Sequence, residues 1–145
     1  MRALMAGKPI ELRNPSATRP WQHVLEPLTG YLQLAEQLTA APELHSQAYN
    51  FGPTAQANRS VQQLAEEILH CWSGAGHLSK ASVAGAPHEA GCLNLVADRA
   101  RQQLGWSSRW GFEQTIERTV RWYQQVHQGN QAMACCLEDL QAYAS

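Results

Sequence analysis

Hydrophobic residues recur every three or four positions in several stretches of this chain, the spacing that places them on one face of an α-helix. In the stretch 26–40 these positions are Leu28, Tyr31, Leu32, Ala35 and Leu38. In a second helix, beginning at Ser60, they are Val61, Leu64, Ala65, Ile68 and Trp72. Ser60 and Gln63 also match a capping box, which predicts where the second helix starts.

The last third of the chain predicts further helices. A long helix over 111–127 follows from the spacing of Phe112, Ile116, Val120, Tyr123 and Val126. A final helix, after the break at Gly129-Asn130, follows from Met133, Cys136, Leu137, Leu140 and Tyr143. A short helix over 97–104 ends at Gly105. Within the long helix, Glu117 and Arg121 have the i,i+4 spacing of a helical ion pair.

Strand signals are short and scattered. Residues 10–12 alternate between apolar and polar, residues 48–51 and 93–96 are further candidates, and one short strand is expected within 77–92. These segments cannot build a large sheet by themselves. We therefore predict an α+β fold that is mostly α, with about five helices and three or four short strands in a single domain over residues 1–145.

Composition narrows the class of protein. The 145 residues are 44% hydrophobic and 16% charged, typical of a globular domain, and the net charge of −1 argues against binding nucleic acid or a membrane surface. No stretch has the roughly 20 apolar residues of a membrane span, and the first residues do not resemble a signal peptide. The four cysteines form no C-x-x-C pair, so we expect reduced thiols and a cytoplasmic protein.

Residues 13–28, which we call the arginine–proline segment, carry the most distinctive chemistry. The segment contains Arg13, Arg19, three prolines, Trp21 and His23, and it leads directly into the helix predicted over 26–40. Proline restricts the backbone of such a segment, and the planar guanidinium of arginine suits forked contact with phosphate. The segment is therefore a candidate phosphate-binding loop.

Residues 13–36 read RNPSATRPWQHVLEPLTGYLQLAE, and this run closely resembles the CDP-glucose 4,6-dehydratases, nucleotide-sugar enzymes of the extended short-chain dehydrogenase/reductase (NAD-dependent epimerase/dehydratase) family. Weaker landmarks follow in the family's order: NFGP at 50–53, HEA at 88–90, LGW at 104–106 and RW at 109–110. The resemblance covers essentially the whole chain. It implies the C-terminal, substrate-binding domain of such an enzyme, with a role in bacterial polysaccharide biosynthesis.

The resemblance also implies what this chain lacks. The family's Rossmann half carries a glycine-rich dinucleotide loop and a Tyr-x-x-x-Lys catalytic pair. Neither pattern occurs in these 145 residues, where the only lysines are Lys8 and Lys80. We therefore expect no cofactor and no catalytic residue in this chain, although NAD is implied for the complete enzyme.

The resemblance points to Arg19 as the residue that contacts the diphosphate of a nucleotide sugar, with Arg13 as a second arm. His88 and Glu89 lie in a loop where related enzymes place another nucleotide contact. The alternatives remain open: without a phosphate contact, Arg19 is a surface or capping residue and Arg13 is a solvated residue. For His23, packing is favoured over acid–base chemistry.

Other side chains give weaker signals. Trp21 is expected to pack rather than to stack on a base, and the remaining tryptophans suit a core or a domain contact. Glu66, Glu67 and His70 share one helix region, but no third ligand converges on them, so a solvated face is expected and no metal.

Two functions follow. The first is a CDP-hexose-binding portion that binds CDP or a CDP-sugar and is not catalytic alone. The alternative is a free-standing, truncated homologue that acts as a structural or interaction protein. It would be a homo-oligomer or bind a missing Rossmann half, because losing that half would expose an apolar surface.

Overall fold

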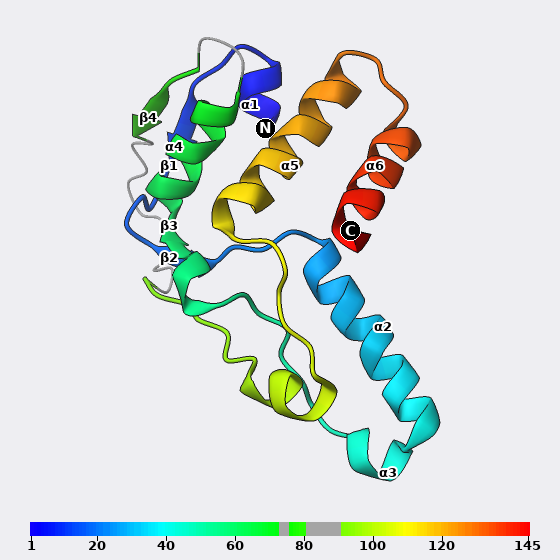
Figure 1. The fold of residues 1–145 in the computed structure, drawn as a ribbon. Helices are drawn as coiled ribbons and strands as arrows, with labels where there is room; N and C mark the ends of the chain where they lie inside the picture. Colours follow the sequence, from blue (N-terminus) through cyan, green and yellow to red (C-terminus); the bar gives the residue numbers. More distant parts are fainter. Residues whose placement is uncertain (73–75, 81–90) are drawn as a thin grey trace.

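The computed structural model describes residues 1–72, 76–80 and 91–145, and it is mostly helical (Figure 1). Helices make up 56% and strands 9% of the structure, which confirms the expected mostly α class with a few short strands. In chain order the elements are α1 (Arg2–Met5), β1 (Ile10–Leu12), β2 (Thr18–Pro20), α2 (Leu25–Ala40), α3 (Pro42–His45), η1 (Ala55–Ala57), β3 (Asn58–Ser60), α4 (Val61–Cys71), β4 (Leu78–Lys80), η2 (Ala100–Leu104), α5 (Phe112–His127) and α6 (Ala132–Ala144).

The strands form two separate pairs. β1 lies parallel to β4, with Ile10 opposite Leu78, and β2 lies antiparallel to β3, with Arg19 opposite Arg59. The strand expected at residues 10–12 is confirmed, and the one expected within 77–92 is β4. The remainder of that range up to residue 90 lies outside the described residues.

Two strand predictions are wrong. Residues 48–51 and 93–96 are irregular, and near the second stretch the structure records an isolated bridge between Thr18 and Cys92. The apolar residues of the first stretch contribute to the core instead, where Phe51 is buried in a hydrophobic cluster. Conversely, β3 is polar and escapes a hydrophobic-pattern search, although its backbone pairs with β2.

The predicted capping box forms as expected at the start of α4. The backbone N–H of Gln63 donates to Ser60 Oγ at 3.1 Å, and the backbone N–H of Ser60 donates to Gln63 Oε1 at 2.9 Å. The apolar stripe of α4 then packs against α5. The expected ion pair between Glu117 and Arg121 of α5 does not form. Arg121 instead pairs with Glu138 of α6, with 2.8 Å between Nη2 and Oε2.

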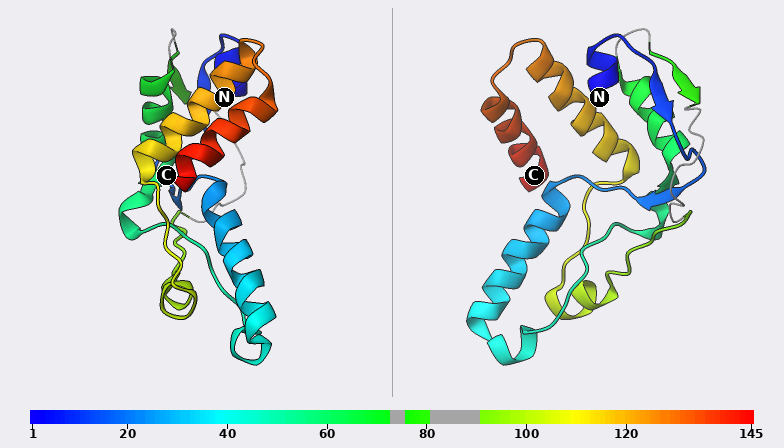
Figure 2. Two further views of the ribbon diagram at one scale, coloured as in Figure 1. Left: turned by 45° about the vertical axis from the view of Figure 1, so that its right-hand side comes forward. Right: turned by 180° about the vertical axis from the view of Figure 1, so that it is seen from behind.

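Two hydrophobic clusters of buried side chains form the core. One lies between α4 and α5 and contains Ala57, Phe112, Ile116 and Val120. The other lies beside α2 and contains Phe51, Ala97, Ala100, Leu104 and Trp106. The helix α2 extends away from the layer formed by α4, α5 and α6 (Figures 1 and 2).

The predicted helices over 26–40 and after Gly129 are confirmed as α2 and α6, but their apolar stripes do not face the core. On α2, Leu28, Tyr31 and Leu32 are exposed, whereas the buried residues are Glu26 and Gly30. On α6, the exposed side chains include those of Met133, Leu137 and Leu140, whereas Cys135, Asp139 and Tyr143 are buried. Both helices thus turn polar side chains inward.

Candidate functional site

The arginine–proline segment joins β1 to α2 and contains β2. The sequence predicted a loop here, but Thr18–Pro20 is hydrogen-bonded to Asn58–Ser60 as a strand. Pro20, which has no N–H to donate, occupies the last position of β2. The candidate phosphate-binding residues are therefore held by strand pairing as well as by proline.

Arg19 occupies the centre of β2 and is half-buried. Its Nη1 donates to the carbonyl oxygen of Thr18 at 2.8 Å. Directly across the ladder is Arg59, and residues that face each other in an antiparallel pair project from the same side of the sheet. Two cationic residues thus stand next to each other at the predicted phosphate contact.

Arg59 was missed by the sequence analysis. It lies in the polar strand β3, where no alternating pattern marks a strand and nothing indicates pairing with β2. Its guanidinium also lies over the ring of Phe112, at 5.5 Å from the centroid, in the geometry of a cation–π contact.

The other predicted contact residues are Arg13, His88 and Glu89. Arg13 is exposed and follows directly after β1. His88 and Glu89 lie outside the described residues. The structure therefore describes two of the four predicted site residues, and it adds Arg59 beside Arg19.

Two side chains anchor the backbone that follows Arg19. The indole Nε1–H of Trp21 donates to the carbonyl oxygen of Arg59 at 3.0 Å, and Gln22 Nε2 donates to the carbonyl oxygen of Phe51 at 2.9 Å. Trp21 also packs against the cluster between α4 and α5. These contacts agree with packing as the role of Trp21 and fix the direction in which the chain leaves β2.

The first turn of α2 carries a fully buried carboxylate. Glu26 is 0% exposed, and its oxygens accept the backbone N–H of Arg109 at 3.0 Å, the backbone N–H of Trp110 at 2.8 Å and the hydroxyl of Tyr143 at 2.7 Å. One side chain therefore joins the start of α2 to the segment before α5 and to the end of α6. Burial, with this hydrogen bond, raises the pKa of Tyr143 to about 12.

His23 packs rather than facing a reactive group. The ring is buried, meets Trp110 edge-on with centroids 4.8 Å apart, and its Nδ1 accepts the backbone N–H of Leu25 at 3.3 Å. Burial lowers the pKa of His23 below its usual 6.5, and this outweighs the carboxylates of Asp139 and Glu26, which favour the proton. The packing interpretation agrees with this geometry.

The lowered pKa of His23 predicts a stability that depends on pH. The neutral ring suits the fold, so its contribution is complete above the unfolded pKa of 6.5 and is lost as the pH falls through the lowered pKa. We expect the free energy of unfolding to fall on acidification from about pH 7.5 to about pH 5.5, and to fall less in His23→Asn, whose amide oxygen still accepts a hydrogen bond.

Urea unfolding at each pH measures this effect. The exposed His127 supplies the control, since His127→Asn should keep the wild-type pH dependence. Equal pH dependence in His23→Asn and the wild type would contradict the assignment.

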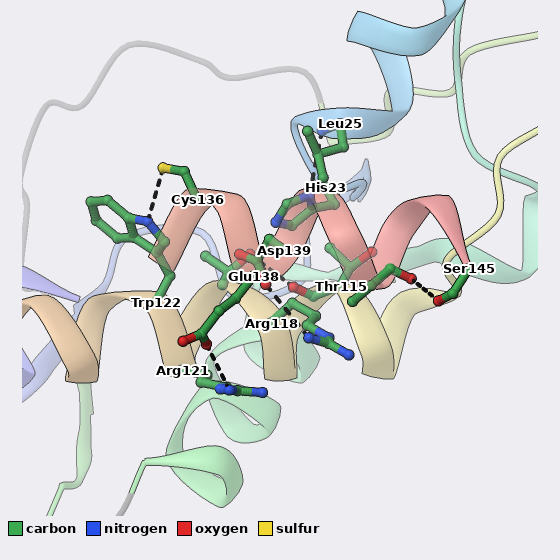
Figure 3. A network of polar contacts seen from close by, with 12 residues as sticks. His23, Leu25, Thr115, Arg118, Arg121, Trp122, Cys136, Glu138, Asp139 and Ser145 are labelled. Carbon is green, nitrogen blue, oxygen red and sulfur yellow. Dashed lines mark hydrogen bonds and ion pairs between the residues drawn. The ribbon is translucent and has the colours of Figure 1, made fainter. Parts of the chain in front are cut away.

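A cavity of about 440 Å³ opens beside His23, between the start of α2, α5 and α6. Its lining includes Val24, Leu25, Trp122, Cys136 and Asp139. Figure 3 shows His23 above α6. It also shows the indole of Trp122, whose Nε1–H donates to Cys136 Sγ at 3.3 Å. Asp139 lies on the inner side, where Arg118 approaches its carboxylate to 3.6 Å. The cavity therefore has mostly apolar walls with a paired carboxylate at one side.

The described residues do not fit a dinucleotide. Binding its pyrophosphate needs a glycine-rich turn from a strand into a helix. Among the described residues, the glycines with positive φ lie at positions 7, 105 and 129, and they instead follow the ends of α1, η2 and α5. In the same described part of the chain, no three His, Cys, Asp or Glu side chains could hold a metal ion, and no helix has the length and apolar character to cross a membrane.

Comparison with known proteins gives a consistent picture, although no protein-family model matches the chain. It is 34% identical over 153 aligned positions to the CDP-glucose 4,6-dehydratase of Salmonella typhimurium, a match that covers 100% of this chain and 40% of that protein. Among solved structures, the dTDP-glucose 4,6-dehydratase of Bacillus anthracis in complex with NAD matches with a TM-score of 0.62 and 16% identity, over 86% of this chain and 37% of that one.

The structure of RMD from Pseudomonas aeruginosa complexed with NADPH also has a TM-score of 0.62, at 16% identity, and the match covers 81% of this chain and 37% of that one. This chain thus spans well under half the length of each of these relatives. By sequence and by fold, the chain is similar to part of the Salmonella and Bacillus dehydratases, which is consistent with a C-terminal fragment of the extended short-chain dehydrogenase/reductase family.

Proposed function

We propose that this chain is the nucleotide-sugar-binding portion of a CDP-glucose 4,6-dehydratase-like protein, which binds a CDP-hexose through its diphosphate. The position of Arg19 carries the proposal. Its backbone is fixed by pairing with β3, and Arg59 stands opposite on the same face of the ladder. Guanidinium groups bind phosphate oxygens through paired donors, so this point suits a dianionic ligand.

Anchoring of the neighbouring residues supports the same role. Trp21 and Gln22 each hydrogen-bond to a backbone carbonyl of another segment, so the strand that presents Arg19 is held before a ligand arrives. A binding group that is already held loses less conformational freedom on binding. Arg13 and, in the region outside the described residues, His88 and Glu89 are proposed as further contacts.

The contribution of Arg19 is tested by titrating CDP and CDP-glucose into the chain by calorimetry. A hydrogen bond to a charged group contributes about 1.5–3 kcal/mol, so Arg19→Ala should weaken binding at least about tenfold. Arg19→Lys should recover only part of this loss, because an ammonium cannot make the forked contact.

The matched control is Arg101→Ala. Arg101 is exposed on η2, where it pairs with Asp98 at 2.7 Å, and CDP binding should not change. Unchanged binding in Arg19→Ala would remove this residue from the site.

We also propose that the chain does not catalyse the dehydration alone, since the hydride carrier and the Tyr-Lys pair belong to the Rossmann half of such enzymes. Purified chain supplied with CDP-glucose and NAD should show no turnover. Measurable turnover would overturn this part of the proposal.

A second function, that of a structural or interaction protein, is favoured by the outward apolar stripes of α2 and α6. Light scattering separates the two functions. A monomer that binds CDP supports the first function, and a tight homo-oligomer indifferent to CDP supports the second.

A further inference from the structure

The cavity beside His23 presents a buried carboxylate that accepts no hydrogen bond from the described residues. This carboxylate belongs to Asp139 of α6, which lines the cavity and is only 8% exposed. Its ion-pair partner, Arg118 of α5, stays 3.6 Å away, beyond the roughly 2.7–3.2 Å of an N–H···O hydrogen bond. A buried carboxylate is stabilised by donors, so its free acceptor positions favour a ligand that brings them.

The cation that pairs with Asp139 does not reach the cavity. Arg118 is not part of the lining, and its guanidinium lies over the ring of Trp110, 5.5 Å from the centroid. In Figure 3, Arg118 lies below α6 and His23 above it. His23 adds no positive charge near neutral pH, since burial lowers its pKa. Among the described residues that line the cavity, the negative charge of Asp139 therefore has no cation beside it.

Two aromatic rings form a corner of the same cavity. Trp122 and Tyr123, consecutive on α5, both line it, and their rings stand at 82° to each other with centroids 5.2 Å apart. The indole of Trp122 is held by its Nε1–H, which donates to Cys136 Sγ at 3.3 Å. Val24 and Leu25 add aliphatic walls. A carboxylate attracts an organic cation through charge and hydrogen bonds, and aromatic faces attract it through their electron-rich surfaces.

We propose that this cavity binds a small organic ammonium ion, with its N–H groups on the carboxylate of Asp139 and its apolar body against Trp122 and Tyr123. The volume of about 440 Å³ lies in the range of small-molecule sites. An ammonium ion supplies the donors that the carboxylate lacks. Neither Arg13 nor Arg19 lines the cavity, so the inference goes beyond the proposed function and does not depend on CDP binding.

Titration of phenethylammonium chloride into the full chain, followed by heteronuclear NMR, tests this site. The indole N–H resonance of Trp122, identified by its loss in Trp122→Phe, reports on the cavity. We expect that resonance to shift to saturation. Phenethyl alcohol has the same ring and chain without the charge, and it should bind at least about tenfold more weakly, because it forms no ion pair with the carboxylate.

Matched charge variants locate the contact. Asp139→Asn removes the charge that faces the cavity and should weaken phenethylammonium binding at least about tenfold. Glu138→Gln makes the same charge change one residue earlier on α6, where the carboxylate pairs with Arg121 outside the cavity, and should leave the affinity unchanged. Circular dichroism checks that each variant is folded. If Asp139→Asn unfolds the chain, the charged and neutral probes on the wild type still decide.

An aromatic variant tests the other wall. Tyr123→Leu should weaken phenethylammonium binding by about threefold or more, because one of the two ring faces is lost. Tyr31→Leu removes an exposed ring from α2, outside the cavity, and should bind the probe as the wild type does.

Three results would overturn the inference. The first is a Trp122 resonance that does not shift with millimolar phenethylammonium. The second is equal affinity for phenethylammonium and phenethyl alcohol, which would leave the cavity apolar without a role for Asp139. The third is tighter binding of N-acetyl-lysine methylamide than of phenethylammonium, which would assign the ammonium group to a lysine side chain of another protein.

Discussion

Glu26→Ala is expected to destabilise this protein by about 3–5 kcal/mol, the largest effect of any substitution considered. The carboxylate accepts the N–H groups of Arg109 and Trp110 and the hydroxyl of Tyr143, and all three would lose this acceptor, those of Trp110 and Tyr143 in a buried place. Each unsatisfied buried donor costs about 1–3 kcal/mol. Thermal unfolding followed by circular dichroism should show a melting temperature lower by roughly 10 °C.

Two further variants serve as comparisons for Glu26→Ala. Glu36→Ala removes an exposed carboxylate from the same helix and should change stability by no more than about 0.5 kcal/mol. Glu26→Gln preserves the shape and one acceptor oxygen but turns an amide donor toward other donors, so its loss should be intermediate. A Glu26→Ala variant as stable as Glu36→Ala would show that the three hydrogen bonds do not hold the helices together.

Gly30→Ala is expected to destabilise the protein by about 2–3 kcal/mol, although alanine is the better helix former by about 1 kcal/mol. An added Cβ would lie 2.3 Å from Cδ1 and 2.6 Å from Cε1 of Phe51, and that ring is buried against Trp106 at a centroid distance of 5.1 Å. The ring must therefore move into an already packed cluster. Urea unfolding measures the loss.

A double-mutant cycle tests the cause. Phe51→Leu should by itself destabilise the protein, because it removes buried aromatic surface. If the ring is what opposes the new methyl group, adding Gly30→Ala to Phe51→Leu should cost clearly less than adding it to the wild type. Strictly additive losses would mean that the glycine is needed for another reason.

The positions of the helices could be read from the sequence because they depend on local signals. Apolar spacing located α2 and α5, and the side chains of Ser60 and Gln63 marked the start of α4, where the structure has both capping hydrogen bonds. These features involve residues within one or two turns of each other, so a single sequence carries them.

The direction of the apolar stripes could not be read in the same way. Periodicity shows that Leu28, Tyr31 and Leu32 share one side of a helix, but not whether that side meets this domain or another one. The sequence therefore did not indicate which side of α2 or of α6 packs in this chain. The reason is physical: the side that packs in this chain is chosen by Glu26 and Gly30, through partners far along the sequence.

The candidate site was predicted in part for a similar reason. The composition of residues 13–28 drew attention to Arg19, and the resemblance supplied its role. Its neighbour Arg59 is brought beside it by strand pairing across some 40 intervening positions, and its own surroundings carry no strand signal. Two polar strands pair through their backbones, and the spacing of apolar residues carries no information about that pairing.

The long reach of Glu26 has a consequence for the order in which this protein folds. Its partner Tyr143 lies 117 positions further along the chain, so the carboxylate cannot gain its full set of donors until that residue has left the ribosome. At ordinary translation rates the interval is on the order of ten seconds. During that time the carboxylate of Glu26 lacks one of its three hydrogen-bond donors, so the start of α2 and the end of α6 are joined only after Tyr143 has emerged.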